Sequence, residues 1–102
     1  MSLVNIDSVH RQVLQILSRT EPPAGIELMS YKRNRSVSVS VLSEQEVIVR
    51  ERGYEELEFT ISRNELPKIL KTMIKREFPR SRKVRINKFS DPAELGRPRK
   101  TL

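Results

Sequence analysis

The sequence predicts an α+β fold, a two-layer sandwich in which an antiparallel five-stranded sheet is covered on one face by two helices, in the order α-β-β-β-β-α-β. Three observations support this prediction. Residues 36–42 alternate between polar and apolar side chains with the two-residue period of a half-buried strand. Residues 7–18 and 62–77 repeat apolar side chains at helical spacing. Only a few residues separate the strand candidates, which favours antiparallel hairpins.

The first helix is expected over residues 7–18, with Asp7 as its N-cap. Its apolar positions fall on one helical face, and two consecutive prolines, Pro22 and Pro23, prevent the helix from continuing. His10, in the first turn, is the only histidine of the chain. A general base or a metal ligand is one interpretation, but no cysteine or second histidine exists to join it. We therefore favour a role as an ordinary helix residue.

Four strands are expected next, over residues 25–32, 36–42, 46–52 and 54–61. Each has one apolar side and one largely polar side, so the sheet needs covering on one face only. In the second of these strands the apolar side consists of Val37, Val39 and Val41. The acidic cluster Glu55, Glu56 and Glu58 lies in the fourth strand. We interpret it as solvated rather than as a metal site, because Glu56 and Glu58 share the polar side while Glu55 points away.

The second helix has the strongest start signal in the chain. Ser62-Arg63-Asn64-Glu65 matches a capping box, although Asn64 as the cap would place Pro67 in the first turn, where proline is tolerated; both starts remain open. Pro79 should end the helix near Glu77. The apolar stripe, which should close the core, consists of Leu66, Ile69, Leu70, Met73 and Ile74, and the opposite side carries Lys68, Lys71 and Lys75.

A fifth strand is expected over residues 83–89, and a capped single turn over 90–96. We accordingly assign residues 1–89 to a single α+β domain and residues 90–102 to a basic C-terminal tail that is expected to be mobile. A chain of 102 residues is long enough for one modest core.

The composition argues against several classes of function. Because cysteine is absent, there is no disulfide framework, thiolate nucleophile or cysteine-based zinc site. With three glycines and no catalytic signature, neither enzymatic activity nor a cofactor is predicted. No apolar run approaches the length of a membrane span, and the start lacks a signal-peptide pattern, so a cytoplasmic location without a membrane partner is expected. No small-molecule ligand is indicated.

The distribution of charge is the main functional signal. The net charge is +7, and residues 63–102 carry 13 Lys/Arg against 4 Asp/Glu, whereas residues 1–62 carry 7 against 9. Such an imbalance is typical of proteins that bind a polyanion, above all DNA or RNA. A basic face that is merely solvated gives the same count of charges. The predicted phosphate-contacting residues are Tyr31, Lys32, Arg33, Arg35, Lys75, Arg76, Arg80, Arg82, Lys83, Arg85 and Lys88.

The run of four strands followed by an amphipathic helix resembles the element order of positive-cofactor-4-like and Whirly-like single-strand-binding proteins. The resemblance is one of element order alone, because no sequence motif supports it, and the leading helix and fifth strand depart from that pattern. It implies a single-stranded ligand, for which Tyr31 offers a stacking platform.

The sequence also permits a protein-interaction or homodimerisation module. In that alternative, the uncovered face of the sheet, with Met29, Tyr31 and Ile48, pairs with a partner or a second copy. Sedimentation separates the two hypotheses, since the alternative predicts a dimer that does not respond to salt.

Overall fold

The computed structural model describes residues 2–30, 35–53, 56–79 and 81–91. Within them the α+β class is confirmed: two helices pack on an antiparallel sheet. Neither helix in this part of the chain is long and apolar enough to cross a membrane. In chain order the elements are β1 (Ser2–Asn5), α1 (Ile6–Leu17), β2 (Gly25–Met29), β3 (Ser36–Val41), β4 (Glu46–Arg52), β5 (Glu56–Ser62), α2 (Leu66–Glu77) and β6 (Lys83–Phe89).

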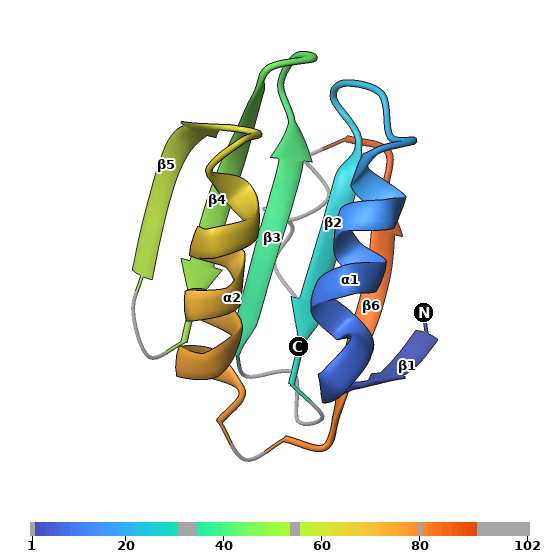
Figure 1. The fold of residues 1–102 in the computed structure, drawn as a ribbon, viewed down its shortest axis with the longest axis vertical. Coiled ribbons are helices and arrows are strands. Elements are labelled where there is room, and N and C mark those ends of the chain that lie inside the picture. The colour runs from blue at the N-terminus through green and yellow to red at the C-terminus, as the bar shows by residue number, and fades with distance from the viewer. Residues whose placement is uncertain (1, 31–34, 54–55, 80, 92–102) are drawn as a thin grey trace, which may run out of the picture.

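The sheet has six strands in the order β1-β6-β2-β3-β4-β5, and every neighbouring pair is antiparallel (Figure 1). Strands β2 to β5 form the predicted meander, and β6 then crosses back to pair with β2. The connection from β5 to β6 runs through α2, which lies along the strands on one face of the sheet (Figure 1). Strands β1 and β6 therefore lie together at one side of the sheet, and β5 forms the opposite edge.

The predicted strand number of five and the order α-β-β-β-β-α-β are wrong, because β1 precedes α1. Strand β1 spans four residues, too few for an alternating pattern to stand out in the sequence. It forms because β6 offers a free edge, with Val4 opposite Val84 and the Val4 side chain buried. Long-range pairing, rather than local sequence, makes this segment a strand.

Both helices lie side by side on one face of the sheet (Figure 1). Between them and the sheet lies one hydrophobic core. Burial of the apolar side of each strand and helix drives this arrangement, since removing apolar surface from water contributes about 25 cal/mol per Å². The largest fully buried apolar side chains include Phe78, Ile26, Leu28, Leu70 and Met73.

Helix α2 starts at neither of the predicted positions. Glu65 is its N-cap residue and no side chain caps the backbone; the Ser62 hydroxyl instead donates to Glu65 Oε1 at 3.4 Å. Two turn-like hydrogen bonds precede the helix, from Glu65 N to Ser62 O and from Leu66 N to Arg63 O. Pro67 consequently falls in the first turn, where its missing N–H costs nothing. The predicted end near Glu77 is confirmed.

The face of the sheet away from the helices also contains buried side chains. Met29 is 3% exposed and Phe89 is 4% exposed. The Phe89 ring lies against Gly25, where a Cβ atom would come within 2.7 Å of it, so glycine makes this close approach possible. Most of the predicted turn at 90–96, and residues 92–102 of the predicted tail, lie outside the described residues.

Candidate polyanion-binding surface

Three lysines form a line along the outer side of α2. Lys68, Lys71 and Lys75 follow one another at i, i+3 and i+7, so their side chains share one side of the helix, opposite its buried stripe. All three are exposed. With a rise of 1.5 Å per residue, the line is about 10 Å long. We call these three residues the α2 basic face.

In the part of the chain that the structure describes, no ion pair is seen at the α2 basic face. The pairs Arg50–Glu58 and Arg76–Glu51 do not include these lysines. The two glutamates closest in sequence point elsewhere: Glu65 accepts from Ser62, and Glu77 is buried with 1% exposure. The three ammonium groups therefore present their positive charge to solvent.

Arg76, on another side of α2, has a structural partner. Its guanidinium forms a bidentate pair with the Glu51 carboxylate of β4, with 2.8 Å from Nε to Oε2 and 2.6 Å from Nη2 to Oε1. The Glu51 side chain is completely buried, and that of Arg76 is 33% exposed. Burial alone would raise the pKa of Glu51, but hydrogen bonds from Arg76 and Glu77 and the charge of Arg76 outweigh it and lower that pKa below its ordinary value.

Arg35 joins the same buried group of charges. Its Nη1 donates to the Glu77 backbone carbonyl at 3.3 Å, and its side chain lies against Gly53. Gly53 has φ of 152°, a conformation that disfavours other residues, and a Cβ there would meet Glu77 Oε1 at 2.5 Å. Arg35 and Arg76 therefore hold the C-terminal end of α2 on the sheet. This structural role accounts for both arginines without a ligand.

The basic residues of β6 do not share one surface. Lys83 and Arg85 lie on the face away from the helices, opposite Asn5 and Met29 respectively, whereas Lys88 lies on the helix side, opposite the core residue Ile26. Five residues of extended strand place Lys83 and Lys88 about 16 Å apart. Lys83 and its neighbour Arg82 are exposed, and Arg85 is half-buried.

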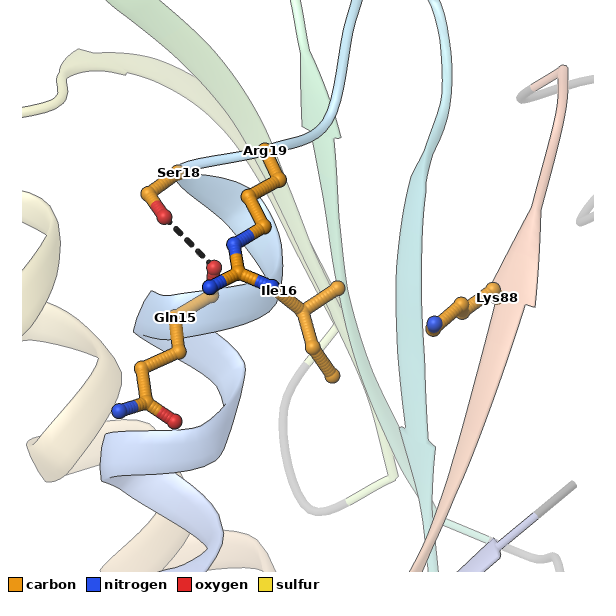
Figure 2. A pocket seen from close by; sticks show the side chains of 5 residues that line it. All are labelled: Gln15, Ile16, Ser18, Arg19 and Lys88. Atoms are coloured by element: carbon orange, nitrogen blue, oxygen red, sulfur yellow. Dashed lines mark hydrogen bonds between the residues drawn. The ribbon is translucent and has the colours of Figure 1, made fainter.

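Lys88 lines a hollow of about 300 Å³ between the last turn of α1 and β6 (Figure 2). Lys88 extends from the strand toward the helix, and Arg19 folds back over the last helical turn beside Gln15 and Ile16. The Ser18 hydroxyl donates to the Gln15 carbonyl at 2.6 Å and so closes that turn. Two cations thus line this hollow, at a distance from the α2 basic face.

Four of the predicted residues, Tyr31, Lys32, Arg33 and Arg80, lie outside the described residues. Of the others, Lys75 lies beside Lys68 and Lys71, which the predicted set of contacts did not include. Their spacing in the sequence was the available signal. The pairing of Arg76 with Glu51 had no such signal, because the two residues are 25 positions apart.

His10 connects the two helices. Its Nε2 lies 2.7 Å from the Pro67 carbonyl, so the ring joins α1 to the first turn of α2. No group of three histidine or acidic residues in the described ranges is placed to hold a metal ion.

Comparison with known protein families, with characterised proteins and with solved structures found no match to this chain.

Proposed function

We propose that the chain is a non-enzymatic nucleic-acid-binding module that contacts backbone phosphates through the α2 basic face. The observation that carries this proposal is the line of three exposed lysines, which have no ion-pair partner among the described residues. Duplex DNA carries one negative charge per 1.7 Å or so of its axis, so a line of about 10 Å faces several phosphates at once.

The two layers of the molecule differ in a way that supports the helical side as the contact surface. On the face of the sheet away from the helices, Arg50 bonds to both Glu58 and Ser40, and Glu56 and Glu46 are exposed beside it. A polyanion would meet carboxylates as well as basic residues there. Within α2, the outer side carries Lys68, Lys71 and Lys75, and the exposed carboxylate nearest to them in the sequence is that of Glu65, just before the helix.

The test is the salt dependence of binding to an unstructured oligonucleotide and to a duplex of the same length. Replacing Lys68, Lys71 and Lys75 by alanine should weaken binding and make the plot of log K against log salt shallower, by about 2 for a single strand and about 3 for a duplex. The control is a variant with Arg19, Arg52 and Lys88 replaced by alanine, which removes three exposed charges elsewhere.

The control variant should retain the slope of the unmodified chain. Equal losses in the two variants would mean that net charge alone attracts the ligand, and would contradict an assignment to α2. Absence of binding at 20 mM salt, or binding that does not respond to salt, would overturn the proposal as a whole. A comparison of the single strand with the duplex at fixed salt then identifies the preferred ligand.

A further inference from the structure

Strand β5 forms an open edge of the sheet. It spans seven residues, it is the last strand in the sheet order, and most of its residues are exposed. In the described part of the chain no strand pairs with its outer side. An edge of this length offers a row of backbone donors and acceptors to another strand.

The hydrogen bonds to β4 define which backbone groups point outward. Arg63 N donates to Gln45 O at 2.8 Å, so residues 63 and 45 form a hydrogen-bonded pair. Bonding alternates along an antiparallel ladder. The N–H and C=O groups of Phe59 and its odd-numbered neighbours therefore point toward β4, and those of Glu56, Glu58, Thr60 and Ser62 point outward.

We infer that β5 is a homodimerisation edge, on which a second copy of this chain docks its own β5 in antiparallel orientation, with a two-fold axis at Phe59. In this register Glu58 lies opposite the second copy's Thr60, and Leu57 lies opposite the second copy's Ile61. Phe59 faces its own copy across the axis. All seven residues of the strand are paired, and each outward-pointing backbone group finds a partner.

Charge selects this register over its neighbours. An axis at Glu58 would place that carboxylate opposite its own copy, and an axis at Leu57 would place Glu56 opposite Glu58 twice. Like charges directly opposite each other destabilise a strand pair. An axis at Thr60 avoids the repulsion but leaves part of each strand unpaired. Only the register centred on Phe59 combines full overlap with carboxylates opposite hydroxyl side chains.

Burial of apolar side chains at this edge favours docking of the second copy. Leu57, on the helix side of β5, is 42% exposed, and Phe59 and Ile61 are half-buried. In the dimer these side chains cover those of the second copy across the new strand pair. The face of the sheet is a poorer candidate, because Met29 at its centre is already buried. The two-fold axis also leaves both helical layers on the same side of the joined sheet.

The first test is the mass of the full chain by sedimentation velocity between 1 and 100 μM, without nucleic acid and at 0.5 M salt. We expect a mass that rises toward twice that of one chain. Thr60→Glu places a carboxylate opposite Glu58 at two symmetric positions and should raise the dissociation constant about tenfold or more, whereas Thr60→Gln should not. Leu3→Glu, at the other edge of the sheet, is a second control. A monomer throughout this range, or a Thr60→Glu variant that dimerises like the unmodified chain, would overturn the inference.

The second test determines the register and does not depend on a destabilising variant. Since the chain has no cysteine, Glu58→Cys and Thr60→Cys chains can be mixed and oxidised with glutathione disulfide. The Cα atoms of opposed residues lie about 5.5 Å apart, within reach of a disulfide, whereas in either variant alone the two cysteines are diagonal neighbours, about 7–8 Å apart. We expect cross-linked dimer in the mixture and little in either variant alone. Equal cross-linking in all three samples would reject the register. These outcomes are independent of nucleic-acid binding, because none is present.

Discussion

The C-terminal end and the outer side of α2 use basic residues for different purposes. At the C-terminal end, Arg76 pairs with the completely buried Glu51 and fixes the helix to β4. On the outer side, Lys68, Lys71 and Lys75 are exposed to solvent and form no ion pair with any residue that the structure describes. The comparison shows that a basic residue indicates a binding surface only when its charge is not already used inside the fold. Adjacent residues such as Lys75 and Arg76 can therefore differ completely in function.

The largest difference between the two regions should appear in stability. We expect Glu51→Ala to lower the free energy of unfolding by about 3 kcal/mol, because it leaves the Arg76 guanidinium without its bidentate partner in a largely buried position. Chemical denaturation monitored by circular dichroism measures this. Glu58→Ala is the matched control, since it breaks the exposed pair with Arg50 and should cost no more than about 1 kcal/mol. Equal losses would mean that the buried pair has no special role.

A smaller loss of folding stability should follow when the pH is lowered. The pKa of Glu51 is lower in the folded chain than its ordinary value of 4.5, so the folded state favours the carboxylate more than the unfolded state does. The stability contributed by this group is present above about pH 4.5 and is lost as the pH falls through the lowered pKa. Denaturation midpoints measured from pH 6 to pH 3 should decrease.

Glu51→Gln separates this contribution from those of the other carboxyl groups. The variant starts from a lower stability, because an amide cannot replace the charge that faces Arg76, but it should lose less stability between pH 5 and pH 3. Parallel pH profiles for the variant and the unmodified chain would contradict the proposed role of the Glu51 carboxylate.

Local patterns were sufficient to predict most of the elements. The alternation of residues 36–42, the apolar stripe of residues 66–74 and the proline at 79 each depend on neighbours in the chain, and each indicated the correct type of element or its end. Strand β1 could not be predicted, because its four residues become a strand only through pairing with β6. The same reason explains the start of α2, where the Ser62 hydroxyl bonds to a carboxylate rather than to the backbone.

The candidate surface was predictable only in part. Segment charge identified residues 63–102 as basic, but side chains alternate between the two faces of a strand, so Lys83 and Lys88 could not belong to one contact. The partners of Arg35 and Arg76 come from distant parts of the chain. The number of basic residues in a segment therefore overestimates the charge that is available to a ligand. The sheet order also determines which strand becomes an open edge, and no local pattern contains that information.

The smallest stability effect should come from the outer side of α2. Replacing Lys68, Lys71 and Lys75 by alanine should change the free energy of unfolding by no more than about 0.5 kcal/mol per site, since the three side chains are exposed and make no ion pair within the described ranges, and since alanine is the better helix former. Removing three like charges from one helix face relieves repulsion, so the net change should be neutral or slightly stabilising. Thermal and chemical denaturation of the triple variant measure it, at low salt, where exposed charges matter most. A loss of 2 kcal/mol or more would show that these lysines support the fold, and the contrast with Arg76 would no longer hold. A stable variant with reduced affinity for nucleic acid would instead assign the two sides of one helix to separate tasks.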